Sequence, residues 1–147
     1  GILYHNRSAT DPGLPARAAS LAETMAADIV VVAVPGGPAT RHLINAEALA
    51  QMKPHGLFIN IARGDVVDEA ALAKALQSGQ IAGAGLDVYI DEPRVPAELR
   101  ALHNVVLSPH CASGTVETRK AMADLCMANM AAYFEGKPIP ALVPECA

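Results

Sequence analysis

The sequence predicts an α/β fold built on a doubly wound parallel sheet. Three observations support this: short apolar runs alternate with helical patterns, the runs are apolar throughout rather than at every second residue, and helix-capping residues lie between them. A continuously apolar run is typical of a strand covered on both faces, and alternating strands and helices imply parallel pairing through right-handed crossovers. The 147 residues fit one such domain.

Five runs have the length and composition of buried strands. They are rich in aliphatic and β-branched residues, and they are ILYH at 2–5, DIVVVAV at 28–34, LFINIA at 57–62, AGAGLDV at 82–88 and NVVLS at 104–108.

Helices are predicted between these runs from their caps. Ser20 begins the pattern at 20–26, Asn45 begins the one at 45–52, and Asp68 precedes a helix over 69–78 that stops before Gly79. The last helix, about 114–135, carries one broad apolar stripe made of Met122, Leu125, Cys126, Met130, Tyr133 and Phe134.

Composition narrows the class of protein. Hydrophobic residues make up 52% of the chain, and its net charge of −4 favours neither a nucleic-acid surface nor an anionic membrane. No apolar run approaches the ~18 residues of a membrane span, and no histidine has a partner at metal-ligand spacing. The cysteines, Cys111, Cys126 and Cys146, are scattered without a C-x-x-C motif. We therefore expect no metal site, and a reducing, cytoplasmic location.

Polar side chains follow three of the predicted strands at their carboxyl ends. Arg63 follows LFINIA, Glu92 follows AGAGLDV after a short loop, and His110 follows NVVLS. In a parallel sheet, ligands bind beyond this edge, so the three side chains are expected to converge on one crevice. Taken singly, each could be a solvated arginine, a turn acid or a loop histidine, because charged groups at strand ends mark sites only statistically.

Together the three groups suit the reduction of a 2-keto acid. A guanidinium can hold a carboxylate through two parallel hydrogen bonds, and a histidine exchanges a proton near neutral pH. A carboxylate beside that histidine fixes its tautomer and favours the imidazolium. Arg63 would bind the substrate carboxylate and polarise the ketone while His110 protonates the ketone oxygen. Because no side chain stores a hydride, a nicotinamide cofactor is implied.

Several longer stretches resemble the D-isomer-specific 2-hydroxyacid dehydrogenases, most of all the bacterial glyoxylate/hydroxypyruvate reductases. They are VPGGPATRHLIN, NIARGDVVDEAAL, GAGLDVYIDEP, LSPHCASGTVETRKAM and NMAAYFEGKP, and together they cover essentially the whole chain. The resemblance implies a Rossmann-like cofactor domain, a homodimer formed through that domain, and a small 2-keto or 2-hydroxy acid as substrate. It implies catalytic roles for Arg63, Glu92 and His110, and cofactor contacts at Val34, Pro35, Thr40, Ile61, Ala62, Arg63, Asp87, His110, Ala112 and Ser113.

Two positions depart from the family's pattern. Gly37 stands where many members have threonine, which puts one phosphate or ribose contact in doubt. Cys111 stands where a small hydrophobic residue is usual, directly after His110. A nucleophilic thiol paired with that histidine is disfavoured, because neighbouring side chains in extended chain point apart.

The residues after the first predicted strand indicate which nicotinamide cofactor is used. In dinucleotide-binding folds an acid at this place binds the ribose 2′-hydroxyl, whereas an arginine accommodates a 2′-phosphate. Here ILYH is followed by Asn6, Arg7 and Ser8, and the first acid is Asp11. The sequence therefore predicts NADP(H), with NAD(H) as the alternative and a loop cation without contacts as the ordinary reading of Arg7.

The glycine-rich phosphate loop of these folds is not found in the chain. A G-x-G-x-x-G motif lies about 20 residues before the ribose-binding position, and Arg7 is too near residue 1 for that. We expect a partial fold without its first strand and glycine-rich loop. Residues 1–136 would form the later part of the dinucleotide-binding domain, and 137–147 an extended tail returning toward a substrate domain absent from this chain. Alone, such a piece is expected to be inactive.

The predicted function is therefore reduction of glyoxylate, hydroxypyruvate or a similar 2-keto acid with NADPH. A relative acting on a different 2-keto acid stays open, since side-chain specificity would come largely from the substrate domain. Formate dehydrogenases are disfavoured by Glu92, where they carry an amide, and D-3-phosphoglycerate dehydrogenases by the lack of an acid near Arg7. A non-enzymatic nicotinamide sensor of the corepressor type retains the same constellation, so the sequence does not separate it from an enzyme.

Overall fold

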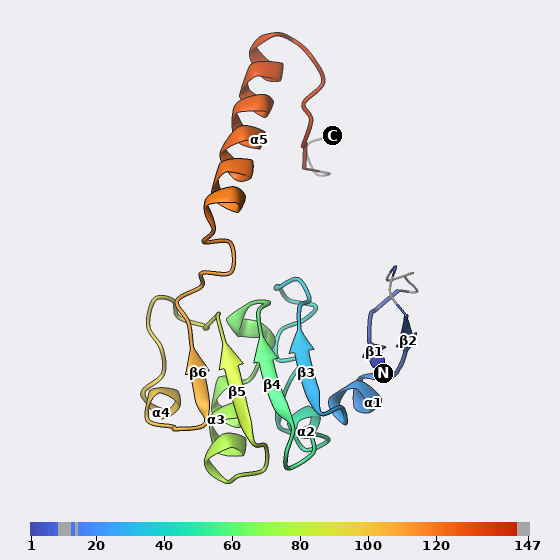
Figure 1. Cartoon of the computed structure of the whole chain (residues 1–147), viewed down its shortest axis with the longest axis vertical. Coiled ribbons are helices and arrows are strands. Elements are labelled where there is room, and N and C mark those ends of the chain that lie inside the picture. Colours follow the sequence, from blue (N-terminus) through green and yellow to red (C-terminus); the bar gives the residue numbers. More distant parts are fainter. Residues whose placement is uncertain (9–12, 14, 144–147) are drawn as a thin grey trace. The chain divides into compact units, whose positions relative to one another are not determined.

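The computed structural model describes residues 1–8, 13 and 15–143, which form two compact units, Gly1–His110 and Cys111–Ala147. The first unit contains two parallel sheets (Figure 1). In the smaller, β1 (Ile2–Tyr4) pairs with β2 (Ala16–Ala18). The larger has the order β3-β4-β5-β6, with β3 (Ile29–Val32), β4 (Leu57–Asn60), β5 (Gly83–Leu86) and β6 (Val105–Leu107). The predicted α/β class with parallel strands is confirmed.

The helices follow the caps read from the sequence. Ser20 and Glu23 form a reciprocal capping box on α1 (Leu21–Met25), the Asn45 side chain accepts from the Ala48 N–H at the start of α2 (Ala46–Leu49), and Asp68 does the same for α3 (Glu69–Gln77). Three short elements were not predicted from the sequence, and they are β2, the 3₁₀ turn η1 (Gly64–Val66) and α4 (Ala97–Arg100).

One face of the larger sheet carries the core. Phe58 of β4 is fully buried together with Leu49 of α2 and Leu72 of α3. The register is regular, because Leu57 pairs with Ile29 on one side and with Gly83 on the other, so even-numbered residues of β4 face the core. The strand order follows the chain order, and right-handed crossovers then place every connecting helix on the same face.

The opposite face of this sheet is exposed within the described part of the chain. Its apolar side chains include Ile29, Val31, Leu57 and Val106, and Val106 is 73% exposed. Continuously apolar strands predicted cover on both faces, and that expectation is wrong for the described residues. Within the described residues of the unit Gly1–His110, the crossover helices lie on the other face of the sheet and leave these apolar side chains exposed.

The second unit is a long helix followed by a tail. Thr115 caps α5 (Val116–Phe134), and the chain leaves the helix through Gly136 at φ 63°. The apolar side chains predicted to pack along one stripe are exposed, and Ala132 is the buried residue of the helix. The Asn129 side chain binds Ala141 at both backbone groups, accepting from its N–H at 3.1 Å and donating to its C=O at 3.4 Å, so the tail is tied to α5.

Some sequence-based predictions fall outside what the structure describes or decides. Asp11 and Cys146 lie outside the described residues. Within the described part of the chain, neither Cys111 nor Cys126 forms a disulfide, and both are exposed. The division into a cofactor domain over 1–136 and a returning tail stays a prediction. None of the described helices is both long enough and apolar enough to cross a bilayer.

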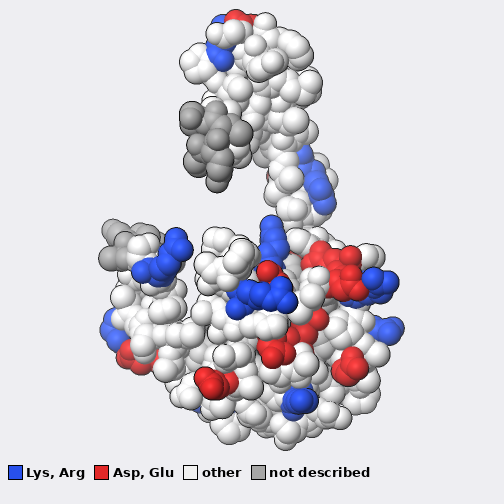
Figure 2. Space-filling view, turned by 180° about the vertical axis from the view of Figure 1, so that it is seen from behind, with Lys and Arg blue, Asp and Glu red and all other residues white. Residues whose placement is uncertain are grey.

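On the face shown in Figure 2, acidic and basic groups are interspersed among a largely uncharged surface.

Candidate active site

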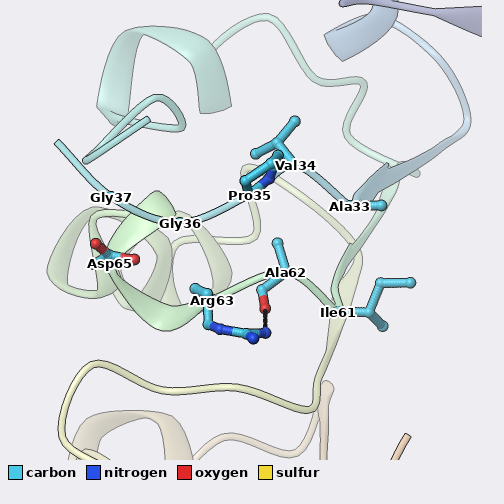
Figure 3. Close-up of a pocket in the computed structure, with 9 residues that line it drawn as sticks. All are labelled: Ala33, Val34, Pro35, Gly36, Gly37, Ile61, Ala62, Arg63 and Asp65. Carbon is cyan, nitrogen blue, oxygen red and sulfur yellow. Dashed lines mark hydrogen bonds between the residues drawn. The ribbon is translucent and has the colours of Figure 1, made fainter. Parts of the chain in front are cut away.

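The turn after β4 is fixed by a buried amide. The Asn60 side chain is 2% exposed, accepts from the Ala62 N–H at 3.0 Å and donates to the Arg63 carbonyl at 3.1 Å. These two hydrogen bonds hold the chain as it leaves the sheet, at the position where the guanidinium begins. Arg63 then donates from Nη1 to the Ala62 carbonyl at 2.7 Å (Figure 3). A guanidinium has five N–H donors, so most of them stay available to a ligand.

Arg63 lies in an open cleft of about 730 Å³ at the carboxyl ends of β3 and β4. A volume of this size falls in the range of small-molecule and cofactor sites. Gly36 is needed here, because a Cβ on it would lie 2.8 Å from Cγ of Arg63. Five residues predicted to contact a cofactor line this cleft together (Figure 3), and they are Val34, Pro35, Ile61, Ala62 and Arg63.

His110 and Glu92 form a hydrogen-bonded pair. Nδ1 of His110 lies 2.7 Å from Oε2 of Glu92, and Oε1 of Glu92 accepts the Tyr89 N–H at 3.0 Å. The backbone of His110 has φ 52°, a left-handed conformation that costs a non-glycine residue of order 1–3 kcal/mol and that recurs at functional sites. An ionised carboxylate only accepts, so Nδ1 carries the proton and Nε2 is the nitrogen that can exchange one with a ligand.

The charge state of Glu92 suits this pairing. The hydrogen bond from His110 lowers the pKa of Glu92 most, the Tyr89 N–H lowers it further, and the positive charge of Arg63 also contributes. The carboxylate is therefore an anion at neutral pH, facing the histidine from one side.

A close backbone approach brings the Arg63 turn against the Glu92 loop. Gly64 follows Arg63 directly, and a Cβ on Gly64 would lie 2.0 Å from the carbonyl carbon of Tyr89 and 2.2 Å from the nitrogen of Ile90. No side chain fits between these two backbones. The structure thus pairs Glu92 with His110 and brings the backbone after Arg63 against the loop that ends at Glu92. Convergence of all three side chains on one crevice, and their catalytic roles, stay predictions.

Asp87 and Tyr89 tie the ends of β5 and β6 together. Asp87 is 8% exposed and accepts a 2.5 Å hydrogen bond from the Ser108 hydroxyl. The Tyr89 hydroxyl lies 3.0 Å from the carbonyl oxygens of both Leu86 and Ser108, and burial raises the pKa of this phenol, which keeps it neutral. Asp87 is thus buried directly after the carboxyl end of β5, and its contact with the cofactor stays a prediction.

The remaining predicted contacts lie at other places. Asn6, Arg7 and Ser8 follow β1 and are exposed, with the Arg7 N–H bound to the Asn6 side chain at 2.8 Å. The Thr40 hydroxyl donates to the Pro35 carbonyl at 2.6 Å and so supports the cleft loop. Ala112 and Ser113 belong to the second compact unit. No group of His, Cys, Asp and Glu side chains within the described ranges could hold a metal ion.

The family model described as D-isomer specific 2-hydroxyacid dehydrogenase, NAD binding domain, matches residues 1–112. The chain belongs to this family. The family and the Rossmann-like fold predicted from the sequence are thereby confirmed.

Other members of the D-isomer specific 2-hydroxyacid dehydrogenase family are closely similar to the chain. A glyoxylate reductase of Pyrococcus furiosus is 47% identical over 97% of this chain and 44% of its own length. A hydroxyphenylpyruvate reductase of Plectranthus scutellarioides is 55% identical over 76% of this chain and 36% of its own. The crystal structure of an NADPH-dependent glyoxylate/hydroxypyruvate reductase from Sinorhizobium meliloti, in complex with NADP and malonate, superimposes with a TM-score of 0.91 at 44% identity, over 99% of this chain and 46% of that one. The chain thus spans less than half the length of these relatives.

Sequence reasoning missed several residues that shape this candidate site. They are Asn60, Gly64, Glu69, Tyr89 and Ser108. Asn60 did carry a signal, since a polar residue inside the apolar run LFINIA must find partners for its amide. The others bind residues far along the chain, and no local pattern marks such contacts.

Proposed function

We propose that this chain forms part of an enzyme that reduces a small 2-keto acid, of the glyoxylate or hydroxypyruvate type, to a D-2-hydroxy acid with NADPH. The observation that supports this most is the 2.7 Å pair of His110 and Glu92 in the neighbourhood of Arg63. These are an acid–base group, an anion that stabilises its protonated form, and a cation for the substrate carboxylate.

The cleft residues suit a dinucleotide. Val34, Pro35 and Ile61 offer an apolar lining at the carboxyl ends of parallel strands, where such cofactors bind, and Asp87 offers a buried acceptor. These residues would hold the nicotinamide part. When bound, NADPH supplies the hydride that adds to the carbonyl carbon of the substrate.

The chain's own residues account for the rest of the chemistry. Arg63 binds the substrate carboxylate through two N–H donors and polarises the adjoining carbonyl. Nε2 of protonated His110 gives its proton to the carbonyl oxygen, which becomes the hydroxyl of the product. Glu92 stabilises the imidazolium before that transfer, and one solvent proton then restores it. Substrate, NADPH and a proton thus yield the 2-hydroxy acid and NADP⁺.

The choice of NADPH is supported by Arg7. A positively charged residue follows the strand where an acid would bind an unphosphorylated ribose. The relative from Sinorhizobium meliloti holds NADP together with malonate. Malonate is a small dicarboxylate, so its presence beside NADP in that protein supports a carboxylic acid as the substrate here.

A bulkier 2-keto acid is the second candidate substrate. The similarity to a hydroxyphenylpyruvate reductase, at 55% identity, favours it. The chemistry at Arg63, Glu92 and His110 would be the same, because only the substituent beyond the keto carbon differs.

We also propose a homodimer in the cytoplasm, with neither nucleic acid nor membrane as a partner. The exposed apolar side chains of Val106, Tyr133 and Phe134 supply surface that a partner subunit could cover. The exposed thiol of Cys126, which forms no disulfide with a described residue, fits a reducing compartment.

The test is turnover by the full coding-length protein. NADPH absorbance is followed with glyoxylate, hydroxypyruvate and hydroxyphenylpyruvate as separate substrates. We expect oxidation with at least one of them, and a loss of about 10²-fold or more in kcat for His110→Gln, whereas the matched variant His103→Gln, at an exposed position, keeps full activity. Tight binding of NADPH, without its oxidation in the presence of any of these 2-keto acids, would overturn the proposed enzymatic function and favour a nicotinamide sensor.

A further inference from the structure

The loop over residues 89–92 joins the parts of the site. It carries Glu92 at its end, and its backbone lies against Gly64, directly after Arg63. Its first residue is anchored to the neighbouring strand end, because the Tyr89 hydroxyl reaches the Ser108 carbonyl at 3.0 Å. The position of this loop therefore sets where the Glu92 carboxylate lies.

Two carboxylates hold consecutive N–H groups of this loop. Glu92 accepts the Tyr89 N–H at 3.0 Å, an interaction within the loop itself. Glu69 accepts the next one, from Ile90, at 2.8 Å. Glu69 is the first residue of α3 and lies six positions after Arg63. One side chain thus connects the segment that carries the cation to the loop that carries the anion.

We propose that Glu69 is a positioning residue for the reaction, which fixes the loop over 89–92 so that Glu92 meets His110. This inference rests on the proposed function. Glu69 acts only through the Ile90 N–H and does not touch substrate or cofactor. Its loss would let the loop move, lengthen the bond between Glu92 and His110, and leave Arg63 in its cleft.

The ordinary role of an acid at this place does not account for the contact. An acid in the first turn commonly caps the helix or interacts with its dipole, but Asp68 already supplies the cap by accepting from the Ala71 N–H. Burial raises the pKa of Glu69, and the neighbouring charge of Asp91 adds to this, while the Ile90 N–H lowers it. The carboxylate is thus kept in a partly desolvated place where its strong partner is that loop amide.

Three variants of Glu69 separate reach from charge. Glu69→Ala removes the acceptor, Glu69→Asp keeps the charge but falls short of Ile90, and Glu69→Gln keeps an acceptor oxygen of the right length. In the full coding-length protein we expect the first two to lower kcat by about 10-fold or more, with little change in the KM for NADPH. Glu69→Gln should stay near wild type, as should Glu47→Ala, which removes the first-turn acid of α2.

A double-mutant cycle shows through which residue Glu69 acts. Adding Glu69→Ala to Glu92→Gln should lower kcat by less than about 2-fold further, since the Glu92 carboxylate that Glu69 positions has already been removed. A purely structural role would predict losses that multiply in full and track the melting temperature. The inference is overturned if losses multiply in this way, if Glu69→Asp matches wild type, or if Glu69→Gln falls as far as Glu69→Ala. Absence of turnover in the wild type would instead overturn the proposed function.

Discussion

The carboxylate of Glu92 and the imidazole of His110 meet at 2.7 Å although they lie 18 residues apart in the chain. They meet because each follows one of two adjacent parallel strands, β5 and β6, whose carboxyl ends lie at the same edge of the sheet. Arg63 follows β4, the next strand along, so three neighbouring strands supply the three groups.

Replacing Glu92 with glutamine should remove the anion but keep the size of the side chain. We expect kcat to fall by about 10²-fold or more, because the imidazolium loses its stabilising charge, while the KM for the keto acid changes little. Steady-state kinetics on the full coding-length protein measures both. Asp91→Asn, at the neighbouring exposed acid paired with Arg94, is the matched control, and an equal loss there would contradict the assignment.

Replacing Arg63 with lysine should mainly weaken substrate binding. Lysine retains one charge but cannot form two parallel hydrogen bonds with a carboxylate, and a charge-assisted hydrogen bond is worth about 1.5–3 kcal/mol. The KM for the 2-keto acid should therefore rise by about 10-fold or more, with the KM for NADPH less affected. Arg94→Lys, at an exposed ion pair, should behave as wild type. An unchanged KM in Arg63→Lys would count against carboxylate binding at this residue.

Replacing Arg7 with alanine should reduce the preference for NADPH. The guanidinium is proposed to contact the 2′-phosphate, which NADH lacks, so the ratio of kcat/KM for NADPH to that for NADH should fall by about 10-fold. Arg17→Ala, on β2 and paired with Glu23, is the control. A wild-type ratio already in favour of NADH would show that the cofactor assignment is wrong.

Glu92 should also make stability depend on acidity. The pKa of Glu92 in the folded chain is below the ordinary value of 4.5, and the largest cause is the hydrogen bond with His110. A lowered pKa means that the group stabilises the fold fully above pH 4.5, and that this contribution is lost as the pH falls through the folded pKa. Such a contribution is lost at about pH 5 and below. Melting temperatures measured between neutral pH and pH 3 should therefore drop more for wild type than for Glu92→Gln. Parallel curves would contradict this.

Gly64 should tolerate no larger residue. A Cβ there would lie 2.0 Å from the Tyr89 backbone, so Gly64→Ala must push the turn and the loop apart, at a cost of about 1–3 kcal/mol or more. Gly85→Ala is the matched control, because its Cβ would meet only the Cδ1 atom of the Ile59 side chain, at 3.1 Å. Denaturant unfolding compares the two, and an equal or smaller loss for Gly64→Ala would be inconsistent with the close approach.

Much of this architecture could be read from the sequence because the signals are local. The side chains of the capping residues Ser20, Asn45 and Asp68 each accept a hydrogen bond from the backbone N–H three residues later, which marks the start of a helix. The site could be predicted because strand ends in a parallel sheet share an edge. Glu69 and Gly64 could not, since their partners at Tyr89 and Ile90 are set by how two loops pack. The continuously apolar strands indicate that both faces of the sheet are to be buried, but the composition of the strands does not identify the structure that covers each face.

Alternate residues of β4 face opposite sides of the sheet, so the geometry of the site depends on which residues of this strand face the core. Phe58 and Asn60 point into the protein, and the amide of Asn60 then directs the chain into Arg63. A single residue inserted within β4 would turn Asn60 outward and rotate everything after it by half a turn, even if every ladder bond re-formed. Insertions and deletions that preserve the site must therefore fall in loops, outside β4 and the turn that follows it.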